Sequence, residues 1–440
     1  MICSIMNIVK ELHLKHRLRD PLYGFIRLND LELKIIDLPI FQRLRRISQL
    51  ALTKYVYPTA EHSRFVHSLG VLEAVTRILT EILYRDDGQR YSAIEIQQIR
   101  LAALLHDIGH LPFSHATEKI LLEKGSHEEI SIKIIETHRP LIDLLKEHEI
   151  KAESITQIIG KKYNNKMYEL ISGVFDADRA DYLRRDSYMC GVEYGNYDFI
   201  RYISSLKYDG LNEQYIINED DIYTVESFVS ARHNYNQQVV YHRTRAGYNI
   251  VIREYIKELL LRNNTDIKTI DIDTLDIDKY IWFDDYTFVE QAKKDMQDSQ
   301  LNNKTWAPYF LRLKHLKCID QIHVYGNPDN SQFANQNKDK IAILKELINE
   351  FANQGKVFVE VSKNNAIKLR NNSNENEQDH KSLYGVKLRY SNKNIDIIEY
   401  SPVLKRFYEE YSEIRRYYCK EEDFDEVTKY IEMKKKVNHG

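Results

Sequence analysis

The chain has 440 residues, of which 43% are hydrophobic and 29% are charged, with a formal net charge of −3 at pH 7. A chain of this length can bury a large core in more than one lobe. Its near-neutral charge leaves a nucleic-acid partner open but does not indicate one. No apolar run reaches the roughly 18 residues of a membrane span, and the four cysteines form no CxxC pair. We therefore predict a cytoplasmic protein without a membrane partner or a disulfide framework.

Helical periodicity dominates the first 263 residues. The predicted helices cover residues 31–50, with a break at Pro39, and residues 63–82, 93–108, 168–190 and about 223–263. Ser126 and Glu129 have the spacing of a capping box, which places His127 in the first turn of a further helix.

The character of the sequence changes after residue 263. Residues 264–280 are expected to form a connection, and a helix is expected from about Pro402 to Tyr418. Short strands are expected at residues 322–325, 356–361, 386–390 and 395–398, with a helix at about 338–353. We predict a mainly α protein, with a helical core and N-terminal arm at residues 1–263 and a smaller α/β lobe at residues 264–440.

The strongest chemical signal is the adjacent pair His106 and Asp107 at the end of the apolar helix of residues 93–108. Burying a carboxylate beside an imidazole is costly unless a metal ion or a hydrogen-bond network compensates. A neutral core histidine would explain the pair alone, but His110 and His115 follow within nine residues. The stretch therefore favours a metal site surrounded by acid–base groups.

A second signal lies on the helix of residues 168–190. Asp178, Tyr182 and Asp186 are four residues apart and share one helical face. A salt-bridged surface is the alternative, but apolar neighbours suggest that the face lines an internal cleft. Asp178 can then complete a metal shell begun by His106 and Asp107, and His67 is the fourth candidate ligand.

These motifs resemble those of the HD-domain phosphohydrolases. The most similar branch is the deoxynucleoside triphosphate triphosphohydrolases, which include bacterial dGTPases and the animal dNTPase that carries SAM and HD domains. The shared stretches are residues 20–24, 41–50, 62–71, 106–115 and 176–186. The resemblance runs from residue 20 to about residue 260, and the C-terminal third is only loosely similar.

The resemblance implies an HD-domain helical core and a metal-dependent hydrolase. The substrate would be a (d)NTP, cleaved to nucleoside and inorganic triphosphate. One divalent ion, which the N/O donors would allow to be Fe, Mn, Ni, Zn or Mg, would be held by His67, His106, Asp107 and Asp178. A further Mg ion would accompany the nucleotide.

The resemblance also implies the residues that surround the substrate. The residues around the scissile phosphate would be His110, His115, Glu118 and His127, with Glu118 in place of the Asp of the animal enzyme. The triphosphate would be held by Arg64, Arg179 and Arg232, and the deoxyribose would be lined by Gln49, Leu50, Tyr182 and Asp186. The family's sugar-gating tyrosine falls on Val240, with Tyr241 one place later. Because one residue turns a helical side chain by about 100°, ribonucleotide rejection stays open.

A guanine-nucleotide activator site is a further implication. Asp37, Gln42 and Arg45 match positions that bind GTP or dGTP at a subunit contact, which implies a homo-oligomer, either dimer or tetramer, and gives the C-terminal lobe a regulatory or assembly role. The alternative for this stretch is a solvated helix face. For the whole protein, the alternatives are an HD-type phosphodiesterase or nuclease, and a nucleotide sensor that no longer turns over.

Overall fold

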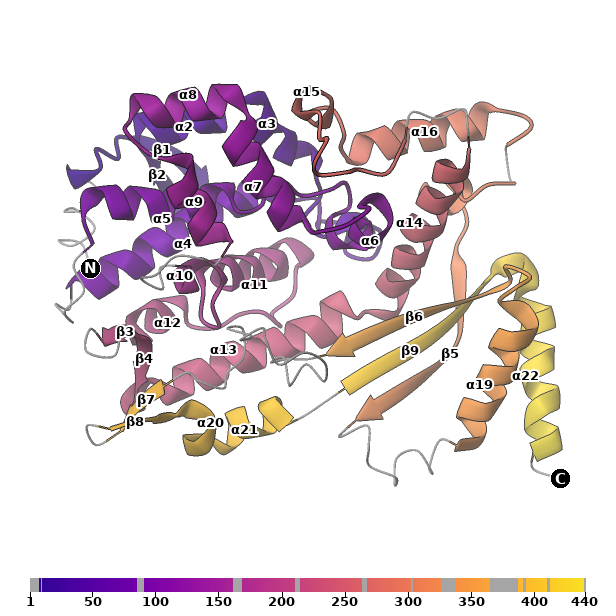
Figure 1. The fold of residues 1–440 in the computed structure, drawn as a ribbon. Helices are drawn as coiled ribbons and strands as arrows, with labels where there is room; N and C mark the ends of the chain where they lie inside the picture. The colour runs from indigo at the N-terminus through magenta and orange to yellow at the C-terminus, as the bar shows by residue number, and fades with distance from the viewer. Residues whose placement is uncertain are drawn as a thin grey trace. The chain divides into compact units, whose positions relative to one another are not determined.

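The computed structural model describes residues 8, 10–84, 91–160, 168–209, 214–262, 267–301, 304–325, 338–364, 387–390, 393–409 and 412–438. The chain forms two compact units, and each draws on separate parts of the sequence (Figure 1). The first unit contains Met1–Tyr235, Thr269–Thr287 and Arg370–Lys405, and the second contains Asn236–Lys268, Phe288–Leu369 and Arg406–Gly440. The predicted division at residue 263 stays a prediction. In the described part of the chain, no helix has both the length and the hydropathy for crossing a membrane.

The first unit is mainly helical, as predicted. Its principal helices are α2 (Asp30–Ile36), α3 (Pro39–Gln42), α4 (Arg64–Tyr84), α5 (Ala93–Leu105), α6 (Glu118–Leu121), α7 (His127–Thr137), α8 (Arg139–Glu147), α9 (Ala152–Ile159), α10 (Glu169–Ser172), α11 (Ala177–Cys190), α12 (Phe199–Ser205), α13 (Ile222–Tyr235) and α15 (Ile277–Tyr280). Short 3-10 turns, η1 (Arg43–Arg46), η2 (Ala51–Tyr55) and η3 (Ser114–Ala116), link several of them.

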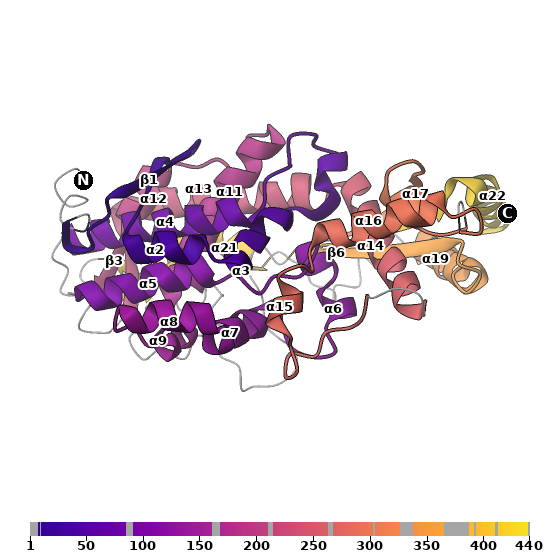
Figure 2. The ribbon, with the colours of Figure 1, turned by 90° about the horizontal axis from the view of Figure 1, so that it is seen from above.

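Helix α4 forms the centre of this unit. It packs against α5 and α11, and Figures 1 and 2 show α4 and α5 side by side. Val71, Val75 and Ile78 of α4 are fully buried, as is the run from Leu101 to Leu105 of α5. The apolar periodicity therefore identified two of the helices that form the core.

Two small sheets complete the first unit. β1 (His16–Asp20) pairs with β2 (Gly24–Leu28), and a four-stranded sheet has the order β3-β4-β7-β8. The strands of this second sheet are β3 (Leu206–Asp209), β4 (Gln214–Asn218), β7 (Lys387–Tyr390) and β8 (Lys393–Asp396). Strands β7 and β8 lie close to the predicted positions, whereas the sequence analysis did not anticipate β1 to β4.

The second unit is built on an antiparallel sheet of order β5-β9-β6. Its strands are β5 (Leu316–Tyr325), β6 (Val357–Asn364) and β9 (Ser412–Lys420), and its main helices are α14 (Arg243–Leu261), α16 (Asp285–Gln297, whose first turn belongs to the first unit), α17 (Ala307–Phe310), α19 (Lys338–Phe351) and α22 (Phe424–Asn438). Leu347 and Val427 of α19 and α22 pack with Tyr417 on one face of the sheet, and Ile250 of α14 packs with Tyr418 on the other.

The helix predicted from Pro402 to Tyr418 was wrong in its second half. Helix α21 (Pro402–Glu409) ends before the central strand β9 begins at Ser412. Because β9 is covered on both faces, Tyr417, Tyr418 and Cys419 are all buried. A strand buried on both faces shows no two-residue alternation, so its pattern does not distinguish it from a helix.

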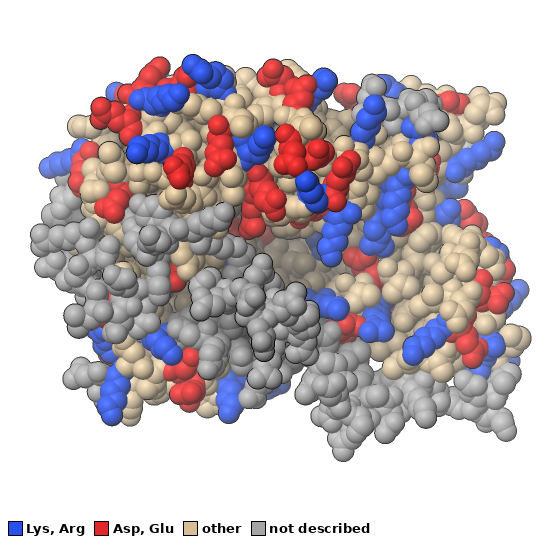
Figure 3. All heavy atoms as spheres, in the orientation of Figure 1, with Lys and Arg blue, Asp and Glu red and all other residues tan. Residues whose placement is uncertain are grey.

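The surface over α8 and its neighbours carries both signs of charge. Figure 3 shows lysine, arginine, aspartate and glutamate side chains interspersed on this face of the first unit. This mixture agrees with the small net charge of −3. Among the described residues over α8 and its neighbours, the two signs are mixed and form no broad basic surface of the kind that binds a phosphate backbone.

A buried ion pair between α2 and α5 gives a test of the core. Glu32 accepts hydrogen bonds from Nε and Nη2 of Arg100 at 2.7 Å each, and both side chains are fully buried. We expect Glu32→Gln to lower the free energy of unfolding by about 3–5 kcal/mol, because it leaves the arginine charge without its counter-ion. Urea denaturation measures the loss, and Asp30→Asn, in an exposed ion pair with Lys15, should cause a much smaller one. Equal losses would contradict the assignment.

Candidate metal centre

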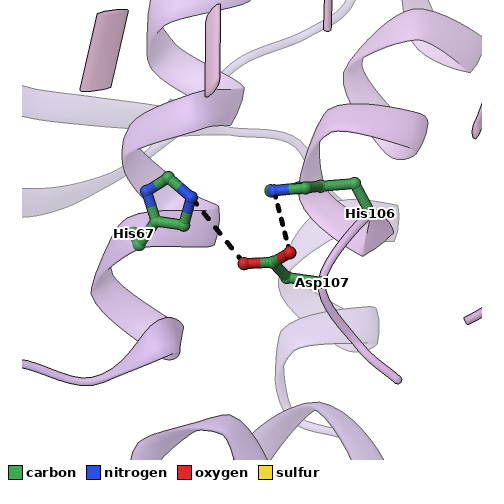
Figure 4. Close-up of side chains that lie close together, drawn as sticks. All are labelled: His67, His106 and Asp107. Atoms are coloured by element: carbon green, nitrogen blue, oxygen red, sulfur yellow. Dashed lines mark ion pairs between the residues drawn. The ribbon is translucent and has the colours of Figure 1, made fainter. Parts of the chain in front are cut away.

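Side chains from three helices of the first unit lie close together: His67, His106 and Asp107 form a group that could hold a metal ion, and Asp178 lies beside it. His67 lies in the first turn of α4, His106 and Asp107 directly follow α5, and Asp178 is in the first turn of α11. The Nε2 atom of His67 lies 3.1 Å from Asp178 Oδ1 and 3.7 Å from Asp107 Oδ2. The Nε2 atom of His106 lies 3.2 Å from Asp107 Oδ1 and 4.0 Å from Asp178 Oδ1. Figure 4 shows both rings turned toward the Asp107 carboxylate.

The outer nitrogen of each ring is already engaged in a hydrogen bond. His67 Nδ1 donates to Asp181 Oδ2 at 2.9 Å, and His106 Nδ1 donates to the Ala103 carbonyl at 2.8 Å. These bonds select the tautomer in which each Nε2 atom carries a lone pair. His106 Nε2 is buried and makes no hydrogen bond to any described residue. In this tautomer two lone pairs face two carboxylates, an arrangement that a bound cation would stabilise.

The charges at the centre support the same conclusion. Burial raises the pKa of Asp107, but Arg64 and the neighbouring histidines hold it well below its usual value. Burial also raises the pKa of Asp178, and the His67 hydrogen bond lowers it to about 2. Burial lowers the pKa of His67, yet Asp178 and Asp181 raise it to about 10. Without a metal ion, a proton on His67 balances these carboxylates. A divalent ion would suit the same His/Asp donors.

A chain of charged groups supports the Nδ1 side of the His67 ring. Arg185 binds both Asp181 oxygens, at 2.8 and 2.9 Å, and its Nη1 donates to Asp20 at 2.8 Å. Gly70 makes this close packing possible, because a Cβ atom there would lie 1.9 Å from Asp181 Oδ1. Asp181 lies three positions after Asp178 and was not predicted to be a supporting residue.

The predicted acid–base residues lie together beside the metal centre. Glu118 Oε1 accepts from both the backbone N–H and the Nδ1 of His127, at 2.8 and 2.9 Å, and Glu118 Oε2 lies 3.3 Å from His115 Nδ1. The His110 and His127 rings are stacked with centroids 3.8 Å apart, and His110 Nε2 is 3.4 Å from Asp107 Oδ1. Burial raises the pKa of Glu118, but the bonds from His115 and His127 lower it strongly. The ionised Glu118 therefore orients His127 and leaves Nε2 as its available nitrogen.

Two of the predicted triphosphate arginines already bind protein groups. Arg64 donates to Ser114 Oγ at 2.8 Å and to Asp107 Oδ2 at 2.5 Å. Arg179 pairs with Asp176 and the Gly173 carbonyl, and both arginines are buried. Arg232 lies in α13, close enough to Tyr182 to lower its pKa, which burial raises.

The predicted sugar-lining residues lie in two neighbouring segments. Asp186 accepts from His62 Nε2 at 2.7 Å and from the Tyr235 hydroxyl at 2.6 Å, and the Tyr182 ring is 6.0 Å from that of Tyr235. Gln49 and Leu50 are buried in the segment between η1 and η2. The amide oxygen of Gln49 has no hydrogen-bond partner within the described ranges, so it can accept from a ligand.

Tyr241 lies in the second unit and not in the first. Its hydroxyl donates to the Lys363 carbonyl at 2.7 Å. Just before it, the long predicted helix of residues 223–263 is interrupted by a π-helical turn, η5 (Asn236–Val240), and then continues as α14. A π turn accommodates one extra residue within a helix. This turn ends at Val240, the position that matches the family's sugar-gating tyrosine, so the extra residue lies next to the one-residue shift from Val240 to Tyr241.

The predicted activator residues surround the end of α2. Asp37 caps that helix and is exposed, Gln42 Nε2 donates to the Ile36 carbonyl at 2.7 Å, and Arg45 Nε donates to Gln42 Oε1 at 2.8 Å. The Arg45 guanidinium also lies 3.5 Å from the centre of the Phe65 ring. This local network is compatible with both the activator site and the solvated face.

The segment Thr269–Thr287, which overlaps the connection predicted at residues 264–280, contributes two residues that were not predicted from the sequence. The Tyr280 hydroxyl donates to the Gly109 and His110 carbonyls at 2.8 and 3.2 Å. Asp285 accepts from the backbone of Phe113 at 2.8 Å. No spacing rule connects these residues to positions about 170 earlier in the chain, so periodicity could not reveal them.

Comparisons with known proteins agree with this geometry. A model of the HD domain matches residues 64–186. The chain is 34% identical over 245 residues to the uncharacterised protein YwfO of Bacillus subtilis, covering 54% of each protein. It is 30% identical over 257 residues to a Dictyostelium discoideum deoxynucleoside triphosphate triphosphohydrolase SAMHD1 homolog, covering 55% of this chain and 49% of that protein. The chain thus spans about half the length of both relatives.

A solved structure extends the likeness to almost the whole chain. A phosphohydrolase of Bacteroides thetaiotaomicron superposes with a TM-score of 0.72 at 26% identity, over 92% of this chain and 99% of that chain.

Asp181 provides a test of the centre that leaves its four candidate ligands in place. We expect Asp181→Asn to weaken divalent-ion binding by about 10–100-fold, because the neutral amide no longer raises the basicity of His67. Equilibrium dialysis followed by metal analysis measures the change. Asp209→Asn is the matched control, since it removes a buried carboxylate that accepts from Arg389 at 2.8 Å outside the centre. An unchanged affinity in Asp181→Asn would contradict this role.

Proposed function

Since residues 64–186 form an HD domain and the chain is similar to a phosphohydrolase over nearly its full length, we propose that this protein is a metal-dependent hydrolase of nucleoside triphosphates. The HD-domain resemblance of its sequence is confirmed by these comparisons. The observation that carries the proposal is the convergence of two Nε2 lone pairs and two ionised carboxylates beside an oriented histidine, His127.

The proposed reaction adds water to the α-phosphorus and breaks its bond to the 5′-oxygen. A divalent ion held by His67, His106, Asp107 and Asp178 would withdraw charge from the phosphoryl group. The leaving 5′-alkoxide needs a proton, and His127 can donate one from Nε2 because Glu118 holds its Nδ1 side. His110 would act with this pair, a role supported by the stacking of its ring on His127 and its contact with Asp107. The products are a nucleoside and inorganic triphosphate.

Deoxynucleotides are the substrate class that the relatives favour, because the Dictyostelium protein bears a dNTP triphosphohydrolase name. The unpartnered amide oxygen of Gln49 and the buried Asp186–Tyr235 pair supply groups that can bind a sugar hydroxyl. Tyr182, Leu50 and Arg232 would line the same space. Tyr241 is proposed to bear on the choice between ribose and deoxyribose.

One observation favours the alternative of a phosphodiesterase or nuclease. Arg64 and Arg179 are buried against carboxylates of the protein itself. A terminal triphosphate would have to compete for these cations, whereas a phosphodiester carries less charge. The phosphate species that is released distinguishes the two reactions. A nucleotide sensor would release none.

We also propose an activator site and a homo-oligomer, both on the basis of the family resemblance. GTP or dGTP would bind near Asp37, Gln42 and Arg45, and a homo-oligomer, dimer or tetramer, would form with the second unit in a regulatory or assembly role. A nucleotide that binds the oligomer preferentially would shift the population toward it. Size-exclusion chromatography with and without GTP tests this coupling.

A substrate panel tests the function itself. The purified protein, supplied in turn with Fe, Mn, Ni, Zn or Mg, is incubated with each dNTP and each NTP, with and without GTP. We expect at least one dNTP to give nucleoside and inorganic triphosphate by mass spectrometry. Monophosphate or oligonucleotide products from nucleic acid or cyclic nucleotides would instead establish the phosphodiesterase alternative.

Two histidine variants separate metal binding from proton transfer. His106→Ala should abolish both the bound ion and turnover. His127→Ala should retain the ion and slow turnover by about 10²–10⁴-fold, the range for an acid–base group. His148→Ala, at an exposed position ending α8, serves as the control and should change neither. Full activity in His127→Ala would refute its role.

A further inference from the structure

We propose that Asp285 is a positioning residue that fastens the predicted substrate-binding segment to the predicted catalytic loop, a role that rests on the proposed function. Its two carboxylate oxygens accept from two backbone N–H groups. Oδ2 accepts from Ser48 at 2.8 Å, and Oδ1 accepts from Phe113 at 2.8 Å. Ser48 directly precedes Gln49, and Phe113 lies between His110 and His115. We call these two bonds the Asp285 latch.

The latch holds a turn that the chain does not favour by itself. Phe113 and Ser114 have φ angles of 57° and 55°, and neither is a glycine. Two consecutive L-residues in the left-handed region are strained and persist only where surrounding contacts hold them. The Phe113 N–H bond to Asp285 is such a contact. This turn sets the direction of η3 and α6, from which His115 and Glu118 project.

Hydrogen bonds continue from the latch to the metal centre. The Ser114 hydroxyl lies 3.2 Å from the Ser48 carbonyl, to which it donates. Arg64 Nε donates to the same hydroxyl at 2.8 Å, and Arg64 Nη1 donates to Asp107 Oδ2 at 2.5 Å. Asp285 thus stands at the outer end of a network that reaches a candidate metal ligand through backbone and side-chain groups.

The chemistry of Asp285 suits this role. The side chain is buried, with 6% of its surface exposed, and burial raises its pKa to about 6. Each of its two oxygens accepts one backbone N–H group, as a carboxylate can. An asparagine has the same shape but only one accepting oxygen, and its NH₂ group would face a backbone donor. Asp285→Asn therefore removes one of the two bonds with little change in volume.

The same segment supports the other end of the catalytic loop. The Tyr280 hydroxyl donates to the Gly109 and His110 carbonyls, and Arg43 lies 4.0 Å from the centre of the Tyr280 ring. Residues 280 and 285 thus contact the loop on both sides of His110. This arrangement is expected of a segment that sets the loop's position.

The test compares Asp285→Asn with Asp284→Asn in the full chain. Asp284 pairs with Arg46 and accepts from the Tyr286 backbone at 2.9 Å, but it does not bond to the loop. We expect Asp285→Asn to lower kcat by about 10–100-fold at unchanged metal content, since small displacements of reacting groups have effects of this size. Asp284→Asn should keep kcat within about twofold. Equal kcat losses in the two variants would overturn the proposal.

A coupling measurement separates positioning from loss of stability. If the latch acts through Glu118 and His127, Asp285→Asn should have little further effect on kcat in a Glu118→Gln background. The same fold loss in both backgrounds would overturn the proposal. Tyr280→Phe should show the same non-additivity and keeps the test available should Asp285→Asn fail to fold.

A readout independent of activity distinguishes this proposal from the proposed function. Hydrogen exchange of a peptide covering residues 109–122 should be faster in Asp285→Asn than in the wild type or Asp284→Asn. If the wild type hydrolyses no triphosphate while this difference is present, the proposed function fails and the latch stands. If exchange is the same in all three proteins, the latch is refuted even when triphosphate is hydrolysed.

Discussion

Asp181 accepts the Nδ1 proton of His67, and this hydrogen bond decides what the centre can bind. It directs the ring's second nitrogen toward Asp178, where a lone pair would meet a negative oxygen. A positive charge between the two atoms, from a proton or a metal ion, would remove this repulsion. The rest of the first unit maintains the arrangement: Gly70 gives Asp181 room beside α4, Arg185 and Asp20 hold its far side, and α5 brings His106 and Asp107 to the same point.

Short-range patterns in the sequence, such as helical periodicity and adjacent residues, gave most of the predictions. His106 and Asp107 are adjacent and end an apolar helix, so their burial together followed from periodicity alone. The helix patterns made Asp178 and His67 candidate ligands, but the distance between them, more than 100 positions along the chain, could not be closed by spacing. The family resemblance implied that they share one site. The same limit explains why Tyr280 and Asp285 were missed. The strand β9 was missed for a different reason, since it is buried on both faces and lacks alternation.

Arg64 and Arg179 are predicted to bind phosphate, but both are buried and already paired with carboxylates of the protein. Arg64 offsets the charge of Asp107, and Arg179 offsets that of Asp176. Each guanidinium therefore stabilises the fold before any ligand arrives, and a phosphate group would enter a site whose cations are already matched. If the proposed triphosphate binds here, its charge would be balanced by a divalent ion, by Arg232, or by a rearrangement of these pairs. The resemblance identified the positions of these residues but could not show which protein carboxylates they bind.

The first unit is discontinuous along the sequence, and its interior depends on chain that returns late. Thr269–Thr287 brings Tyr280 and Asp285 to the loop of residues 109–122, and the strand β7 from Arg370–Lys405 pairs with β4. An excised fragment that stopped at residue 263 would keep every candidate metal ligand and still lose these supports. The span matched by the HD-domain model, residues 64–186, is therefore shorter than the first unit, whose last segment reaches Lys405 and is synthesised after most of the polypeptide.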